Sequence, residues 1–141
     1  SRTVLRVWSE DRIVEKIGPE IPGSMRFLSA GALAANGCIY YAPYNAMGVL
    51  CIDTAKQEVE VMQPEILGKN MYTVAGVMAE NGCIYFAPCQ ARQVLCVHPA
   101  EQRFELLGPE MSTQPKYLAD GVLAPNGCIF FAPSDAASVL C

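Results

Sequence analysis

The sequence predicts an all-β protein built from β-propeller blades, and three observations favour this fold class. An eight-residue block that begins with Asn-Gly occurs at 36–43, 81–88 and 126–133, at a constant step of 45 residues. Each repeat holds four short runs of strand-forming residues separated by turn residues. No run has the apolar spacing of a helix. Four strands in about 40–50 residues, repeated without helices, are typical of a propeller blade.

The first strand of a blade, strand A, is expected at Ser29–Ala34 and one step later in each copy. It is rich in alanine and glycine, and Gly31 recurs as Gly76 and Gly121. These glycines would permit close backbone approach where blades crowd toward the axis of a propeller. The Asn-Gly pair that follows predicts a tight hairpin turn into the next strand.

The other three strands follow in the same repeat. Strand B is predicted at Cys38–Ala42, which is rich in isoleucine and tyrosine. Strand C is predicted at Val49–Asp53, and a polar turn at Thr54–Gln57 leads into strand D at Val59–Met62. Proline at position 64 ends strand D because it cannot donate to a β-ladder.

The phase of the repeat gives one partial propeller domain over 1–141, with units near 4–48, 49–93 and 94–138 and the start of a fourth at 139–141. The strand order is then C-D, A-B-C-D, A-B-C-D, A-B. Three blade equivalents are too few to close a ring, since propellers have about four to eight blades. The chain is therefore expected either to be part of a longer propeller or to form a head-to-tail homodimer, with the former favoured.

The repeat resembles a known group of propeller families. The pattern Asn-Gly-x-Ile-Tyr-x-Ala, followed by Val-Leu-x-Ile-Asp-Thr and Glu-Val-Glu, is similar to the YVTN and virginiamycin-B-lyase-like repeats, and more broadly to NHL and kelch blades. The resemblance covers nearly the whole chain but lies in scaffold residues. It implies a propeller fold and leaves function open, because these families include surface-layer proteins, a lyase and many scaffolds.

Composition excludes some partners. The formal net charge is −4 and the basic residues are scattered, so nucleic acid is not an expected partner. The uncharged stretch between Arg26 and Asp53 contains turn residues, so no transmembrane segment is expected. No cofactor motif is present. The number of thiols gives a slight preference for a reducing intracellular compartment, the cytoplasm or an organelle interior.

Six of the seven cysteines fall at repeat positions as pairs on strands B and C, and Cys89 lies in a loop outside them. A hairpin centred at Tyr44-Asn45 would place the members of each pair opposite each other. They are then either cross-strand disulfides, redox pairs or, as we favour, buried free thiols. No CxxC spacing points to zinc. The pairs are Cys38 with Cys51, Cys83 with Cys96, and Cys128 with Cys141.

No catalytic constellation can be assembled from the sequence. His98, the single histidine, occupies the repeat position of Asp53 and Trp8, and the sequence gives it no fixed partner. Trp8 is expected either to anchor a partner or to pack against the next blade.

The loops that join strand D to A and strand B to C differ among copies, whereas the A–B turns do not. Both variable sets are expected on one rim, where a rigid scaffold usually carries binding specificity. Drift in solvated loops is an equal alternative. The candidate rim residues are Met25, Arg26, Tyr44, Asn45, Lys69, Asn70, Arg92, Gln114 and Lys116.

The predicted function is a non-catalytic protein-protein interaction or assembly scaffold, a peripheral subunit whose partners are other subunits or the remaining blades. The alternative is a lyase- or hydrolase-type propeller enzyme whose catalytic blades lie outside this chain. A carbohydrate-binding propeller is less favoured, since the chain has one tryptophan and no recurring aromatic loop residue.

Overall fold

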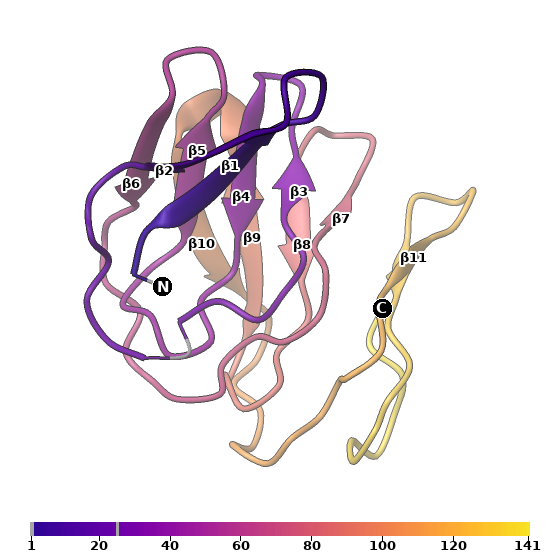
Figure 1. Cartoon of the computed structure of the whole chain (residues 1–141). Helices are drawn as coiled ribbons and strands as arrows, with labels where there is room; N and C mark the ends of the chain where they lie inside the picture. Colours follow the sequence, from indigo (N-terminus) through magenta and orange to yellow (C-terminus); the bar gives the residue numbers. More distant parts are fainter. Residues whose placement is uncertain (1, 25) are drawn as a thin grey trace.

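The structure is a computed structural model that describes residues 2–24 and 26–141. It is all-β apart from one short 3-10 helix, η1 (Pro99–Glu101), and its strands form four antiparallel sheets (Figure 1). Sheet 1 contains β1 (Val4–Trp8) and β2 (Ile13–Ile17). Sheet 2 contains β3 (Ala32–Leu33), β4 (Cys38–Tyr41), β5 (Leu50–Asp53) and β6 (Glu58–Val61).

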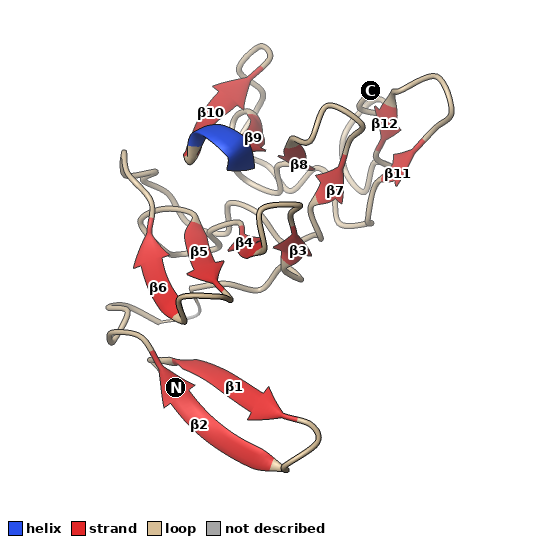
Figure 2. Ribbon diagram, turned by 90° about the horizontal axis from the view of Figure 1, so that it is seen from above, coloured by secondary structure: helices blue, strands red, loops and turns tan. Residues whose placement is uncertain are grey.

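The next two sheets repeat this order. Sheet 3 contains β7 (Val77–Met78), β8 (Ile84–Phe86), β9 (Val94–His98) and β10 (Arg103–Leu107). Sheet 4 contains β11 (Val122–Leu123) and β12 (Ile129–Phe130). In the view from above, the sheets follow one another in chain order, and the short strands β3, β7 and β11 lie on the same side of the molecule (Figure 2). Strands β7 and β11 are in contact.

The main core lies between sheets 2 and 3. It joins the face of sheet 2 that carries Tyr40 and Cys51 to the opposite face of sheet 3. That face of sheet 3 contributes Ile84, Phe86, Leu95, Val97 and Phe104. Burial of each large side chain stabilises the fold by about 1.5–3 kcal/mol, so this stacking dominates the cohesion of the two sheets.

Two smaller cores attach the outer sheets. Sheet 1 packs on the other face of sheet 2, where Val4 and Ile17 meet the cluster around Leu50. Sheet 4 packs beside sheet 3, where Phe131 and Tyr117 meet Val74. Each sheet therefore buries its apolar residues against its neighbour in the chain.

The hairpin turns between the first and second strands of each repeat form as the Asn-Gly pairs predict. Gly37, Gly82 and Gly127 adopt positive φ angles of 80°, 78° and 82°. This left-handed region is accessible to glycine at no steric cost. The preceding asparagine accepts the backbone N–H two residues on, as Asn36 Oδ1 does from Cys38 N at 3.0 Å.

The first strand of each repeat is much shorter than the predicted Ser29–Ala34, because only Ala32 and Leu33 pair with β4. The predicted close approach at its glycines is made by an aromatic ring of the next strand, not by a neighbouring backbone. A Cβ at Gly76 would lie 2.5 Å from Phe86 Cζ, and one at Gly31 would lie 2.6 Å from Tyr41 Cζ. Glycine is therefore required because a ring packs directly on it.

The turn after β9 also departs from the predicted polar turn, because Pro99–Glu101 forms η1 there. Proline at the first helical position suits this turn, since its missing N–H would have no partner. Within the described residues, no helix is long and apolar enough to span a bilayer.

Candidate functional site

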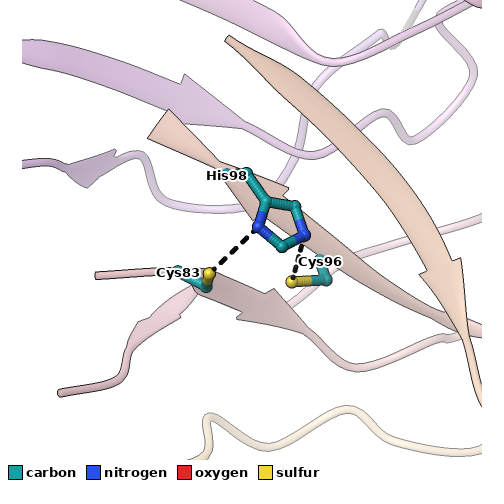
Figure 3. A group of neighbouring side chains, drawn as sticks. All are labelled: Cys83, Cys96 and His98. Atoms are coloured by element: carbon teal, nitrogen blue, oxygen red, sulfur yellow. Dashed lines mark hydrogen bonds between the residues drawn. The ribbon is translucent and has the colours of Figure 1, made fainter. Parts of the chain in front are cut away.

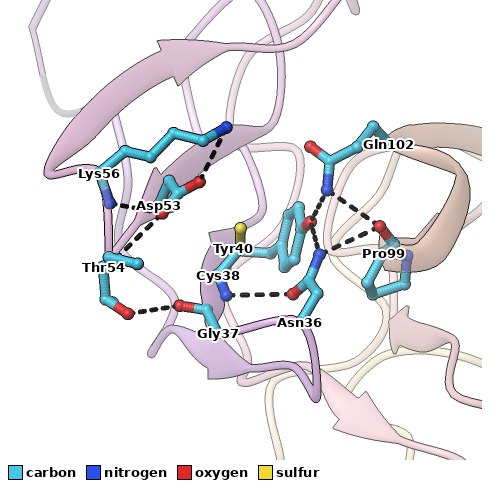
Figure 4. A network of polar contacts seen from close by, with 10 residues as sticks. Asn36, Gly37, Cys38, Tyr40, Asp53, Thr54, Lys56, Pro99 and Gln102 are labelled. Atoms are coloured by element: carbon cyan, nitrogen blue, oxygen red, sulfur yellow. Dashed lines mark hydrogen bonds and ion pairs between the residues drawn. The ribbon is translucent and has the colours of Figure 1, made fainter.

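A polar junction ties sheet 2 to η1 of sheet 3 (Figure 4). Asn36 Nδ2 donates to the Tyr40 hydroxyl at 3.0 Å and to the Pro99 carbonyl at 3.1 Å. Gln102 Nε2 donates to the same two oxygens at 2.8 and 2.9 Å. Burial raises the pKa of Tyr40 to about 12, so its hydroxyl stays neutral and accepts both donors. These contacts fix how the two sheets stack.

Beside this junction lies a pocket of about 330 Å³ lined by Cys38, Cys51, Asp53, Glu58 and Glu60 with three further polar residues. Asp53 is already engaged, since its Oδ1 accepts the backbone N–H groups of Ala55 at 3.0 Å and Lys56 at 2.9 Å. The Lys56 backbone N–H chiefly holds the pKa of Asp53 below its usual value. Asp53 therefore acts as a cap for the turn after β5.

The Cys38 and Cys51 thiols do not sit directly opposite each other, which corrects the sequence prediction. Cys51 pairs with Tyr40 and Cys38 pairs with Asp53, so the two cysteines are diagonal neighbours on one face. The hairpin is centred one residue later than the predicted Tyr44-Asn45. Burial is the main reason that the pKa of Cys51 rises to about 12.

In sheet 3 the equivalent cysteines, Cys83 and Cys96, gather around His98 (Figure 3). Cys83 Sγ lies 3.3 Å from His98 Nδ1, and Cys96 Sγ lies 3.5 Å from His98 Nε2. Glu105 Oε1, across the strand pair from Cys96, lies 2.6 Å from Nε2. The prediction that His98 has no fixed partner is wrong, because stacked strands bring three groups to its ring.

The third pair lies in sheet 4. Cys128 is half-buried and Cys141 is exposed, and both line a cavity of about 660 Å³ between sheets 3 and 4. Tyr85 and Phe131 also line it. All seven cysteines are free thiols in the structure, and Cys89, which lies outside the repeat positions, is buried.

Sheet 1 fills the equivalent positions with different chemistry. Arg6 stands where Cys51 and Cys96 stand, and Trp8 stands where Asp53 and His98 stand. Glu15 accepts from Arg6 Nε at 2.7 Å and from Trp8 Nε1 at 2.7 Å. The Arg6 guanidinium lies 4.5 Å from the centre of the indole ring. Trp8 is thus held within its own hairpin.

The loops predicted to share a rim are joined by backbone hydrogen bonds. Tyr44 N donates to the Arg26 carbonyl at 2.6 Å, and Cys89 N and Ser134 N make the same contact one and two repeats later, at 2.8 and 2.7 Å. Asn70 N donates to Asn45 Oδ1 at 2.9 Å and so links the loop of one repeat to the next. The rim residues Tyr44, Asn45 and Asn70 therefore hold the loops together.

The charged rim residues divide into two groups. Lys69 and Arg92 line an open pocket of about 470 Å³, where Arg92 Nη1 pairs with Glu110 Oε2 at 2.6 Å. Arg26 Nε donates to the Pro22 carbonyl at 2.8 Å and so braces its own loop. Gln114 is exposed. Met25 lies outside the described residues.

Lys116 departs from its predicted exposed position. It is 4% exposed, and its Nζ donates to the carbonyl of Ser112 at 2.6 Å and to that of Gln114 at 3.2 Å. Burial lowers the pKa of this ammonium group. It therefore ties its own loop together and is not a surface contact for a partner.

One recurring aromatic position was missed from the sequence. The buried Tyr72 hydroxyl donates to the Gln93 carbonyl at 3.0 Å, and Tyr117 donates to Ser138 at 3.1 Å one repeat later. An aromatic residue recurs at this repeat position, and that recurrence was the sequence signal that could have identified the contact. Burial raises the pKa of Tyr72 well above its usual value.

Comparison with known proteins identifies the class of fold. No family model matches the chain, and no curated protein matches it in sequence. Among solved structures it is similar to a catalytically inactive H270A virginiamycin B lyase from Staphylococcus aureus, crystallised with quinupristin, with a TM-score of 0.67 and 10% identity. The match covers 99% of this chain and 47% of the lyase, so the chain spans about half that protein's length. At this identity the likeness defines the fold alone, a β-propeller-like arrangement of antiparallel sheets.

Proposed function

We propose that the chain is a non-catalytic assembly scaffold of the β-propeller type, in which sheets 1 to 4 are successive blades in the order C-D, A-B-C-D, A-B-C-D, A-B. Further sheets of the same repeat cover the faces that sheets 1 and 4 leave open. The function then consists of presenting one rim of loops to partner proteins from a rigid stack of blades.

The observation that carries the proposal is the exposed apolar face of sheet 1. Leu5 and Val7 are 61% and 59% exposed. Their repeat equivalents in sheet 2, Leu50 and Ile52, are 4% and 7% exposed because sheet 1 covers them. The corresponding residues of sheet 3 are fully buried against sheet 2. The same face that stacks in sheets 2 and 3 is therefore open in sheet 1.

Sheet 4 leaves the complementary face open. Phe130 is 40% exposed, whereas Tyr40, at the same repeat position in sheet 2, is fully buried under sheet 3. Val122, which pairs with Phe130, is 67% exposed. Exposed apolar faces of this kind mark interaction surfaces. A sheet like sheet 1 fits the open face of sheet 4, since sheets of this repeat already stack in that order.

Light scattering after size exclusion tests the proposal, because a second copy of the chain supplies the missing sheet. Wild type is expected to self-associate in a concentration-dependent way, and the double variant Leu5→Lys/Val7→Lys is expected to be monomeric. The control is Leu67→Lys, at a residue that is 80% exposed and lines the loop pocket beside Lys69 and Arg92 instead of either open face. Wild type that stays monomeric at all concentrations would contradict the proposal.

The proposal also assigns the binding of partner proteins to the rim of loops. Lys69 and Arg92 present basic groups beside a concave surface, and the loops that carry them are hydrogen-bonded into a fixed arrangement. Charge reversal of both residues is expected to weaken binding of a partner protein without changing the oligomeric state. Unchanged partner binding in that double variant would remove the rim from the proposal.

A lyase-type function is the second candidate, supported by the structural likeness to virginiamycin B lyase. Because the catalytic blades of such an enzyme would lie outside this chain, the test incubates quinupristin with a longer protein that contains this chain and its further blades, and follows the products by mass spectrometry. Under the scaffold proposal quinupristin remains intact, and turnover at a rate proportional to the concentration of that longer protein would favour the enzyme.

A further inference from the structure

Sheet 3 gathers a set of soft and borderline metal ligands that sheets 1 and 2 do not. One ligand atom from each of Cys83, Cys96 and His98 lies within 4.8 Å of the other two. Among the described residues, these three are the ones that bring cysteine, histidine or acidic ligand atoms close enough together to hold a metal ion. We propose that these three residues bind one Zn²⁺ ion.

Strand geometry explains why the ligands converge. Cys96 and His98 are two residues apart on β9, so their side chains leave the same face of the sheet. Ile84 pairs with Val97, which places Cys83, the residue immediately before β8, opposite His98. Strand β9 and the residue that leads into β8 thus supply all three ligands, and the adjoining ladder holds them close together.

The donor set and spacing suit zinc. Zinc binds thiolate sulfur at about 2.3 Å and imidazole nitrogen at about 2.0 Å in tetrahedral sites, so neighbouring ligand atoms lie about 3.5–3.8 Å apart. Cys83 Sγ lies 3.3 Å from His98 Nδ1, close to that spacing, whereas the 3.5 Å contact of Cys96 Sγ is to Nε2, on the other side of the ring. Binding of one ion at Nδ1 therefore requires the Cys96 side chain and the ring to rotate so that all three ligand atoms, which already lie within 4.8 Å of one another, point to one position. The ring lies between the two sulfurs in Figure 3.

Glu105 acts as a positioning residue for the ring. Its Oε1 lies 2.6 Å from His98 Nε2, so that nitrogen carries the proton and donates, and Nδ1 faces Cys83 with its lone pair free. A carboxylate that accepts from the other nitrogen of a metal-bound histidine fixes its tautomer and orientation.

The charge of the proposed complex balances. Binding releases the two thiol protons to solvent, so that two thiolates and one neutral imidazole meet Zn²⁺ and the unit is uncharged. A neutral unit suits this location, where Cys83 and Cys96 are 9% and 1% exposed. A fourth position remains for a water molecule or an added ligand.

Sheet 2 provides an internal control, because Cys38, Cys51 and Glu60 occupy the same positions as Cys83, Cys96 and Glu105. Its remaining position holds Asp53, which is occupied in capping the turn. A single residue, His98 in place of aspartate, therefore separates the proposed site from its counterpart.

Titration of the reduced 141-residue chain with Co²⁺, a spectroscopic stand-in for Zn²⁺, tests the site. One equivalent is expected to bind with sulfur-to-cobalt charge-transfer absorption, and Zn²⁺ is expected to displace it. Cys96→Ser and His98→Asp are each expected to weaken binding at least tenfold, whereas Cys51→Ser binds as wild type does. Glu105→Gln is expected to bind about tenfold more weakly with the charge-transfer band retained.

His98→Asp is expected to keep the fold intact, because sheet 2 carries aspartate at that position and forms the same strands. Conversely, Asp53→His is expected to raise the stoichiometry from one ion to two. The proposal would be overturned by Co²⁺ binding without charge-transfer bands, by equal losses in Cys51→Ser and Cys96→Ser, or by a stoichiometry that stays at one in Asp53→His.

Discussion

Sheets 2 and 3 have the same strand register, but they carry different side chains at the end of the third strand. Tyr40 pairs with Cys51 and Cys51 with Glu60 in sheet 2, and the same three positions pair in sheet 3. At the end of the third strand, the Asp53 carboxylate accepts a backbone N–H of the following turn, whereas the His98 ring contacts two thiols. The ladder therefore sets where side chains stand, and one substitution in the repeat decides the chemistry.

The two sheets also differ in burial. Phe86 of sheet 3 is fully buried against sheet 2, whereas Tyr41, its repeat equivalent, is half-buried beneath the smaller sheet 1. The residues of sheet 3 thus carry more of the packing between sheets. The following variants break or sharpen this comparison.

The largest effect is expected for Phe86→Ala. Removal of a fully buried ring leaves a cavity, and the expected loss in the free energy of unfolding is about 3–5 kcal/mol. Tyr41→Ala is expected to cost clearly less, since its ring keeps access to water. Urea unfolding followed by circular dichroism measures both, and equal losses would contradict the difference in packing between the sheets.

The next largest effects are expected at the two glycines on which these rings pack. Gly76→Ala is expected to destabilise the fold by about 1–3 kcal/mol, because the added methyl group meets a ring that has nowhere to move. A Cβ at that position would lie 2.5 Å from Phe86 Cζ. Gly31→Ala is expected to cost less because Tyr41 can swing outward. Thermal unfolding of both variants checks the order, and a reversed order would show that the ring over Gly31 is the more rigid one.

Tyr40→Phe and Tyr85→Phe compare the polar junction with its counterpart. The Tyr40 hydroxyl accepts from Asn36 and Gln102, so its removal is expected to cost about 1 kcal/mol. Tyr85 accepts from Asn81 at 2.9 Å at an exposed site and is expected to cost less. The difference in urea midpoint between the two variants measures this, and Gln102→Ala is expected to reproduce much of the Tyr40 effect.

The smallest effect concerns pH at the turn of sheet 2. Because the pKa of Asp53 is held below its usual 3.8, chiefly by the Lys56 backbone N–H, the capped turn gains stability above that pH. The gain is lost as pH falls through the lowered value. Asp53→Asn is expected to show a slightly lower melting temperature at pH 7 and a weaker dependence on pH below 4. Wild-type and variant curves that stay parallel down to pH 2 would contradict this.

Most of the fold could be predicted from the sequence because its signals are local. The Asn-Gly turns, the alternation in β4 and the strands Leu50–Asp53 and Glu58–Val61 depend on residues close together in the chain. The short pairing of Ala32–Leu33 could not be predicted, since alanine and glycine give no clear strand boundary.

The candidate sites were less predictable because they depend on register and stacking. A shift of one residue in the centre of the β4–β5 hairpin decides whether Cys38 faces Cys51 or Asp53. The burial of Lys116 depends on how its loop folds over its own carbonyl groups. Neither the register of the hairpin nor the burial of Lys116 can be predicted from the spacing of residues along the chain.

The sequence by itself determined a 45-residue repeat of four antiparallel strands with fixed turns, because backbone preferences and side-chain alternation act over a few residues. Only the tertiary structure decided which faces stack, which apolar faces of sheets 1 and 4 stay open, and that His98 meets Cys83 and Cys96. Those outcomes depend on contacts between strands and between sheets, where a repeat specifies position but each copy supplies its own chemistry.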